Sequence, residues 1–396
     1  MNWTLLIPGA LLPPALAPEL TRHMHAPVLA AHLALARPLP ARADEDIADT
    51  HGVAASQAAH WQWLASRFVP DAEDLPTAPY AWRVVSPHGT GGGAHRPGGA
   101  DDSGVWIAHC DPVHMAIARD HFMVTDLAGA PLLAPESAEL LDRANAVLAA
   151  EACVSPAALA PRLRIAVRGG RWFLLSPRPL DLRTWSLDAV LGQSVQDRLP
   201  TGADARRWRV LGNEIQMSWH ASNTNDARET SGLRTANALW VHGGGVWQHL
   251  GRAAQYALLA DDAPAEATVL RGWMDAADRC ADAVQAPARP ATLSICRALF
   301  NAHAHQAWES WLAQLPLIDA RIGSDLAAAR AAGATRFDLV LCGSATTRTV
   351  TLPLQTHWWR RFRFGAHAPG ALLQRFLADT PTARKPASRA SGALAA

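Results

Sequence analysis

Short apolar runs that stop at glycine or proline recur along the chain, and this pattern predicts buried β-strands. The first run covers residues 3–7 and ends at Pro8-Gly9. Residues 163–167 and 172–175 flank Arg168-Gly169-Gly170-Arg171, which predicts a β-hairpin. Further strands are expected at 105–108, 121–127, 238–241, 256–260 and 336–342, and a C-terminal hairpin is expected from 350–352 and Trp358-Trp359.

Other segments place apolar residues at three- and four-residue steps, which is the spacing of an amphipathic helix. The clearest is 203–220, where Trp208, Leu211, Ile215 and Trp219 fall on one face. Helices are also expected at 18–39, 44–68, 136–150 and 300–315.

The segments between these elements are expected to be irregular. Polar residues dominate 221–235, and Asp111-Pro112 is expected to form a turn. The glycine-rich tract 86–104 is expected to be a surface excursion, because a phosphate-binding loop would need a Lys and a Ser or Thr opening a helix. The small, polar tail 381–396 is expected to be disordered.

The order of the elements, with a helix and a hairpin among strands in the first half, predicts the fold class. We expect a single-unit α/β protein that contains an antiparallel or mixed α+β lobe rather than repeated βαβ units. At 396 residues the chain is long enough for one large domain with an insertion, or for two closely packed lobes.

Composition narrows the classes of function and the expected location. The formal net charge is +1, from 36 basic and 35 acidic residues, so no overall field favours nucleic acid or an anionic membrane. The 5 cysteines show no Cys-x-x-Cys spacing, which predicts reduced thiols and a cytoplasmic protein. No apolar run reaches the roughly 18 residues of a membrane helix. Residues 5–17 lack the preceding basic residue of an export signal.

Residues 213–245 are the most informative segment for function. Amide and guanidinium donors on Asn225, Arg228 and Asn237 precede a predicted strand that ends in Gly243, Gly244 and Gly245. Such donors suit an anion like a phosphorylated acid, and glycines at a strand end allow a ligand to approach the backbone. The alternative is a loop whose polar side chains satisfy its own backbone.

The same segment resembles a known family. The pattern Asn-x-x-Arg-x-x-x-Gly-x-x-x-x-Asn-x-x-Trp-x-x-Gly-x-Gly resembles that of archaeal-type cofactor-independent phosphoglycerate mutases, with Ser222-Asn223 in place of the mutase His-Pro. It is borne by Asn225, Arg228, Gly232, Asn237, Trp240, Gly243 and Gly245. Together with residues 5–9 and 106–126, it resembles still more the RpfE-type regulatory proteins of proteobacteria, over most of the chain.

The resemblance implies an alkaline-phosphatase-like core with a mixed sheet flanked by helices. Residues 1–80 and 236–380 would form this core, and residues 81–235, with the Asn/Arg loop, would form a smaller inserted α+β lobe. In that superfamily the first strand ends in a metal-binding Asp-Gly and a Ser or Thr nucleophile follows, but here the strand ends in Pro8-Gly9. We therefore expect that the first metal carboxylate is missing and that the protein has no metal cofactor.

A divalent metal enters only under an alternative in which the site is rearranged. Asp261 and Asp262 follow a predicted strand, and His303 and His305 lie where the family has Asp-x-x-x-His, although Asn301 stands at the acidic position. Carboxylates and imidazoles are suitable ligands for such a cation. A His-x-His pair is more often a surface feature or a capped helix start, and this explains the two histidines without a metal.

His109, Asp111 and His114 form a second cluster, near Cys110. Two imidazoles and a carboxylate this close in sequence suit acid–base chemistry or a metal. A turn in which Asp111 caps backbone donors, beside a packed His114, explains the same residues without a function.

Three hypotheses for function follow from these observations. The first is a phosphoglycerate-mutase-like protein that has lost two-metal phosphoryl transfer and binds a small molecule or regulates a partner. The second is an active metal-dependent phosphomutase or phosphatase with a rearranged site. The third is a non-catalytic scaffold for protein interaction. The expected partners are a phosphorylated small acid or a protein, and neither nucleic acid nor a membrane.

Overall fold

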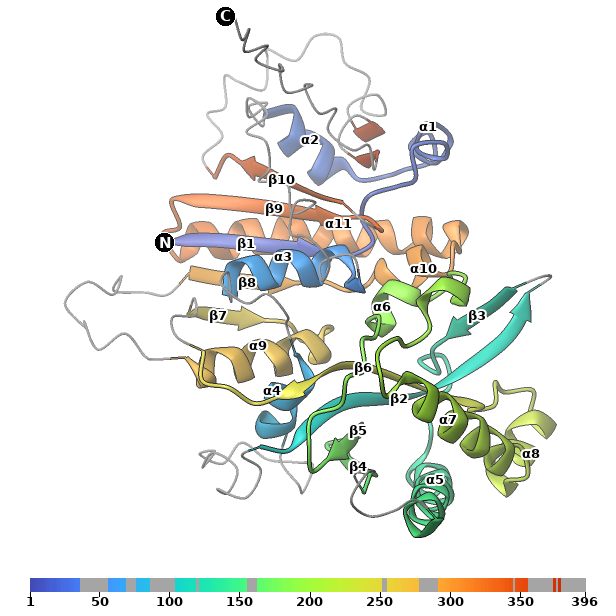
Figure 1. The fold of residues 1–396 in the computed structure, drawn as a ribbon. Helices are drawn as coiled ribbons and strands as arrows, with labels where there is room; N and C mark the ends of the chain where they lie inside the picture. The colour runs from blue at the N-terminus through green and yellow to red at the C-terminus, as the bar shows by residue number, and fades with distance from the viewer. Residues whose placement is uncertain are drawn as a thin grey trace, which may run out of the picture.

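The computed structural model describes residues 1–35, 56–68, 76–85, 104–118, 121–154, 162–250, 255–277, 291–344, 346–354, 373–374 and 377–378. Two β-sheets, with helices between them and on their outer faces, make up the described part of the molecule (Figure 1). One sheet is mainly parallel and the other antiparallel, so the fold is mixed α/β, as the sequence predicted at the level of class.

The first sheet has the strand order β10-β9-β1-β8-β7. Its strands are β1 (Asn2–Ile7), β7 (Tyr256–Leu259), β8 (Ala291–Ile295), β9 (Arg336–Cys342) and β10 (Thr347–Leu352). Strands β9, β1, β8 and β7 are parallel, and β10 is antiparallel to β9 at the edge. The predicted strands at 3–7, 256–260 and 336–342 are confirmed, and β10 includes the predicted 350–352.

Alternation along β1 explains how this sheet is buried on both faces. Trp3, Leu5 and Ile7 pack into a core with α2 (Pro27–Leu35) and α11 (Trp308–Ala331). Leu6 points the other way, toward α3 (Ala59–Phe68), α4 (Ala78–Val84) and α9 (Pro264–Ala276). Parallel strands covered on both sides read as continuous apolar runs, which is why β1 was visible in the sequence.

The second sheet lies between β1 and β7 in the chain and has the order β3-β2-β5-β4, with β6 also paired to β2. Its strands are β2 (Trp106–Ala118), β3 (His121–Thr125), β4 (Arg164–Arg168), β5 (Arg171–Ser176) and β6 (Ala238–Val246). The β4–β5 hairpin is confirmed, and Gly169 and Gly170 have φ of 54° and 75°, as a two-residue primed turn requires.

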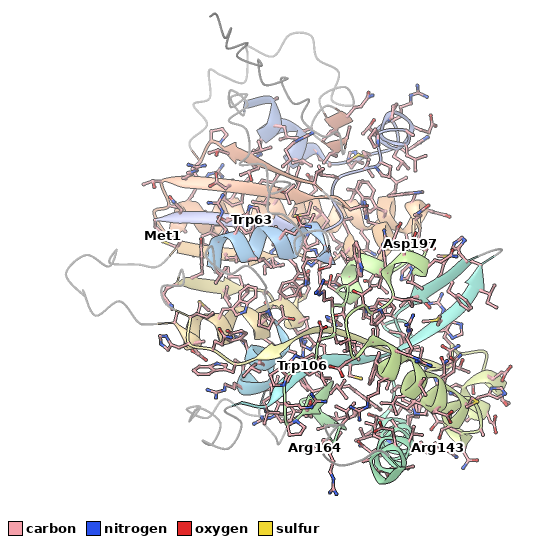
Figure 2. The ribbon with its side chains drawn as sticks, viewed as in Figure 1. Met1, Trp63, Trp106, Arg143, Arg164 and Asp197 are labelled. Carbon is pink, nitrogen blue, oxygen red and sulfur yellow. The ribbon has the colours of Figure 1, made fainter. Side chains whose placement is uncertain are left out.

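Helices cover both faces of this sheet. Trp106, Leu174 and Val241 face a core with α5 (Ala134–Val154) and α7 (Ala205–His220), whereas Ile107 and Phe173 face α4 and α9. Figure 2 shows the side chain of Trp106 near the centre of the molecule and that of Arg164 at its outer edge. The helices α3, α4 and α9 therefore lie between the two sheets.

Two loop predictions are wrong. Asp111 and Pro112 lie inside β2, where they pair with Trp240 and Leu239 of β6, so the expected turn is absent. The expected irregular loop at 221–235 contains α8 (Asn223–Thr230). In addition, β6 does not stop before the three glycines but continues through them to Val246.

Three smaller elements complete the description. They are α1 (Ala17–Leu20), α6 (Leu187–Val190) and α10 (Phe300–Ala304), with a 3₁₀ turn at Gln196–Arg198. The predicted helices 18–39 and 300–315 each correspond to two helices, α1 with α2 and α10 with α11, and α11 continues past the predicted end to Ala331. The tract at 86–103, Trp358-Trp359 and the tail 381–396 lie outside the described residues.

Candidate functional site

A pocket of about 210 Å³ lies between the two sheets, next to the carboxyl end of β8. It is lined from both sides, by residues of α3, α6 and α9, of β2, β5 and β6, and of the segments that join them. These residues are Gln57, Trp61, Thr77, His109, Asp111, Asp126, Arg171, Ser186, Leu187, Asp188, Leu191, His242, Ala265, Val269 and Arg297. The ends of parallel strands are a common position for ligand sites, because loops and helices diverge there.

Arg297 and Asp188 form the most strongly charged contact in the pocket. The guanidinium donates to both carboxylate oxygens of Asp188, at 2.8 and 3.0 Å, and also contacts Glu266. The Asp188 Oδ2 atom accepts further hydrogen bonds from Trp61 Nε1 at 2.9 Å and from His60 Nε2 at 3.1 Å. The result is a buried network that joins α3, α6, α9 and the segment that follows β8.

Charge pairing decides the protonation of this network. Burial alone would raise the pKa of Asp188, but the charge and hydrogen bonds of Arg297, with those of His60, hold it well below its usual value. Burial alone would lower the pKa of Arg297, but Asp188 and Glu266 keep it raised. The pair is therefore ionised throughout the physiological pH range.

Two histidines and an aspartate form a second group, on β2 and β6. His242 Nε2 lies 2.8 Å from Asp111 Oδ2, and the rings of His242 and His109 stack with centroids 4.9 Å apart. Burial and the neighbouring His242 lower the pKa of His109 to about 3, so this ring is neutral. Burial would raise the pKa of Asp111, but its hydrogen bond with His242 lowers it overall.

Arg171 and Thr77 contribute polar groups to the pocket that are not used elsewhere. Among the described residues, the half-buried Arg171 guanidinium forms no hydrogen bond or close ion pair, although the charges of Asp111 and Glu266 are near enough to favour its charged form. The Thr77 hydroxyl lies beside Gly243, where an added Cβ would collide with Thr77 Oγ1. The backbone of Thr77 is held by a 3.1 Å hydrogen bond to the Gly243 carbonyl. A guanidinium and a hydroxyl are thus available to a bound molecule.

The amides and guanidinium predicted to bind a ligand make their hydrogen bonds within the protein. Asn225 donates to the carbonyls of Trp219 and Ala236, both at 2.9 Å, and accepts from the Ala236 N–H. Arg228 is only 2% exposed, and its guanidinium reaches Glu136 and the carbonyls of Ala130 and Arg234. These contacts fix the chain between α7 and β6.

Asn225 and Asn237 nevertheless line a second cavity, of about 700 Å³, between α7, α8 and β2. Asn237 bonds the backbone of Met115 through both ends of its amide. His114 lines the same cavity, with Nδ1 3.0 Å from the Thr235 carbonyl. The sequence cluster of His109, Asp111 and His114 is thus divided between two cavities.

The three glycines of β6 allow close packing beside the first pocket. A Cβ on Gly244 would collide with the Trp106 ring, and one on Gly245 would collide with Pro76. Gly243 also has a φ of 58°, which only glycine adopts easily. These positions bring β6 close to the segment that precedes α4, and Gly243 adjoins the pocket through Thr77.

The four candidates from the C-terminal half do not line the first pocket, but Asp262 and His305 each contact a residue that does. Asp262 Oδ2 accepts a 2.9 Å hydrogen bond from the Arg297 backbone, and His305 Nε2 lies 3.9 Å from Asp126, which lines the pocket. His303 packs on Trp308 with ring centroids 5.6 Å apart, and Asp261 is exposed after β7. No contact between these aspartates and histidines is recorded among the described residues.

Most of the pocket was not predicted from the sequence. His60, Asp188, Glu266 and Arg297 stand in segments without a recognisable motif, and Arg171 appeared only as a turn residue. One signal was used only in part. The sequence grouped His109 and Asp111 with His114, but had β2 been predicted to continue through Pro112, alternation along the strand would have kept His109 and Asp111 on one face and placed His114 on the other.

Comparisons with known proteins give a weak structural resemblance only. No protein-family model matches this sequence, and no curated protein matches it. Among solved structures, a cofactor-independent phosphoglycerate mutase from Thermoplasma acidophilum is 11% identical, with a TM-score of 0.30 and 88% of each chain covered. A protein from Pyrococcus horikoshii is 10% identical, with a TM-score of 0.33, and covers 89% of this chain and 86% of its own.

At these TM-scores the resemblance carries no argument for function, and none of the comparisons supports the RpfE-type likeness. In the part of the chain that the structure describes, no helix has the length and apolar character needed to cross a membrane.

Proposed function

We propose that this protein binds a small molecule with an anionic group in the pocket between its two sheets. The observation that carries the proposal is Arg171: its guanidinium lines the pocket and has no hydrogen-bond or ion-pair partner among the described residues. Arg297, in contrast, is already neutralised by Asp188 and Glu266. A half-buried guanidinium without a partner is a strong binder of carboxylate or phosphate.

The size and lining of the pocket restrict the ligand. At about 210 Å³ it is smaller than the roughly 300–1,000 Å³ of sites for drug-sized molecules. Besides Arg171, it offers the Thr77 hydroxyl and the His242 imidazole as polar partners. A phosphorylated small acid, the ligand class expected from the sequence, meets these requirements.

The finer family assignment remains part of the proposal. An alkaline-phosphatase-like core is supported by the parallel order β9-β1-β8-β7 and by the position of the second sheet between β1 and β7. The RpfE-type likeness and a regulatory role rest on the sequence motif alone. Loss of two-metal phosphoryl transfer is supported by Pro8-Gly9 at the tip of β1, where Gly9 packs against the backbone of α10.

The test is ligand binding by the wild type and by Arg171→Gln. Phosphorylated three-carbon acids and inorganic phosphate would be screened by thermal shift, and the best ligand measured by calorimetry. We expect Arg171→Gln to weaken binding about tenfold to a hundredfold, the loss of one charge-assisted contact worth about 1.5–3 kcal/mol. Arg164→Gln, an exposed arginine on the neighbouring strand β4, is the matched control and should bind normally.

Equal affinity in Arg171→Gln and the wild type would contradict the proposal. Arg228→Ala separates the pocket from the sequence motif. Because Arg228 bonds only within the protein, we expect its loss to reduce stability and to leave the affinity of the folded protein unchanged.

The hydrogen bond between Asp111 and His242 favours a second candidate, a metal-independent enzyme that acts on the bound molecule. A carboxylate that orients an imidazole is the usual arrangement of a general base, and the Thr77 hydroxyl lies in the same pocket. The measurement is phosphate release from phosphorylated acids in the presence of a chelator. Turnover that persists in His242→Gln would exclude this role for the pair.

A further inference from the structure

The chemistry of a divalent-cation site is present beside the pocket, on three different helices. His60 on α3, Asp188 on α6 and Glu266 on α9 each offer one ligand atom, and these atoms lie within 4.8 Å of one another. One imidazole nitrogen and two carboxylate oxygens are ligands that Zn²⁺ and Mn²⁺ accept. All three side chains are buried or nearly so, with exposures of 2%, 14% and 0%.

The guanidinium of Arg297 already occupies the cationic position of this cluster. Its NH1 nitrogen contacts Asp188 Oδ2 and Glu266 Oε1. The same two oxygens lie within hydrogen-bond or ion-pair range of His60 Nε2. Its NH2 nitrogen contacts the other Asp188 oxygen at 2.8 Å. The Phe300 ring, 4.1 Å from Arg297 Cζ, and Asp262 on the Arg297 backbone hold the residue in place.

One atom of the cluster is left without a partner. Glu266 is fully buried, and its Oε2 oxygen has no hydrogen-bond partner among the residues that the structure describes. An unpaired oxygen of a buried carboxylate is costly, and such atoms call for a specific explanation. A metal ion could bind both oxygens of Glu266, whereas the guanidinium as placed contacts only Oε1.

We propose that Arg297 takes the place of a metal ion in this protein, and that His60, Asp188 and Glu266 form a divalent-cation site that is closed by its guanidinium. With Arg297 in position the three residues do not fit a resident metal, because the guanidinium already occupies the place between the two carboxylates and uses the oxygens that would bind the ion. Removal of the guanidinium would open the site to Mn²⁺ or Zn²⁺. The inference does not depend on anion binding at Arg171.

The experiment compares the metal content of the wild type, Arg297→Ala and Arg297→Gln. Each protein would be incubated with Mn²⁺ or Zn²⁺, passed through a desalting column and examined by elemental analysis. We expect one bound ion in each variant and none at this cluster in the wild type. Saturation with metal should raise the melting temperature of the variants by about 5 °C and leave that of the wild type unchanged.

Two further proteins identify the site. Arg321→Ala removes another partly buried arginine that is paired with an aspartate, Asp325, but has no imidazole ligand recorded beside it, and it should gain no metal. The double variant Arg297→Ala with Glu266→Gln should lose the metal that Arg297→Ala gains. Its loss would assign the ion to this cluster rather than to an exposed histidine.

Several results would overturn the proposal. One is that Arg297→Ala or Arg297→Gln folds but retains no metal. Another is that the wild type holds a stoichiometric ion and that Glu266→Gln loses it. Failure of both arginine variants to fold in saturating Mn²⁺ and Zn²⁺ would also overturn it, since the cation is expected to replace the missing charge. A negative result here would leave the prediction for Arg171 intact, because that test uses the wild-type cluster.

Discussion

At the scale of single residues, burial makes His109 sensitive to acid. The ring is 5% exposed and stacked on His242, and its pKa falls to about 3 in the folded protein. An unfolded chain would protonate the same ring near pH 6.5. Between these pH values the unfolded state binds a proton at this ring and the native state does not. The free energy of unfolding therefore decreases as the pH falls through this window.

We predict that His109→Gln removes much of this acid sensitivity. The linkage amounts to about 1.4 kcal/mol per pH unit, and we expect the wild type to lose about 2 kcal/mol more than the variant between about pH 6 and about pH 4. Urea denaturation at both pH values measures the difference. His25→Gln, at an exposed histidine, should retain the wild-type slope. Parallel slopes for wild type and His109→Gln would contradict the prediction.

Single residues also show why sequence patterns can mislead about a site. Asn225 and Arg228 have the polar, motif-like appearance of ligand contacts, yet their donors bond carbonyls and Glu136 within the protein. Arg171 looked like a turn residue, yet it is the guanidinium that faces the pocket. The type of a residue gives its bonding capacity, but only the fold determines which partner uses that capacity.

At the scale of elements, the close approach of α4 and α9 depends on Gly272. A Cβ at this position would lie 2.6 Å from the Tyr80 carbonyl oxygen, which is closer than real contacts allow. Because that atom belongs to the backbone of α4, neither helix can accommodate the methyl group without moving. Both helices lie between the sheets, and Ala265 and Val269 of α9 line the pocket.

We therefore predict that Gly272→Ala destabilises the protein by about 1–3 kcal/mol, the usual cost of overpacking. The control is Gly212→Ala in α7, where an added Cβ meets nothing within 4 Å. That change should be neutral or stabilise the helix by up to about 1 kcal/mol, because alanine has the higher helix propensity. Chemical denaturation of both variants measures the two effects, and equal stabilities would exclude the proposed contact.

Elements differ in how far the sequence predicts them. Strand β1 is a continuous apolar run because helices cover both faces of its sheet, and the β4–β5 hairpin has two glycines at its turn. Helix α8 was missed because its first turn is stabilised from outside the segment. Ser222 caps it locally, but Glu139 of α5 accepts the backbone N–H groups of Asn223 and Thr224. A local pattern cannot show a partner that distant in sequence.

At the scale of the whole molecule, Asp188 joins parts of the chain that belong to different layers. It lies on α6, in the segment that contains the second sheet, and it binds Arg297 after β8 and His60 and Trp61 of α3. Its charge offsets that of a buried arginine, so its removal leaves a cation in the interior with only Glu266 to balance it. The first pocket lies at this junction. A substitution of Asp188 should therefore weaken the structure of both sheets.

We predict that Asp188→Asn, which keeps the shape of the side chain, lowers the free energy of unfolding by about 2–4 kcal/mol, somewhat below the cost of leaving a buried charge fully unpaired. Hydrogen exchange should increase both in β8 and in β2, because the network connects the two sheets. Asp197→Asn, an exposed aspartate in the nearby 3₁₀ turn, is the control and should be neutral (Figure 2). Faster exchange in only one sheet would show that the network is local to that sheet. An unchanged free energy of unfolding would show that Arg297 does not depend on Asp188 for its charge balance.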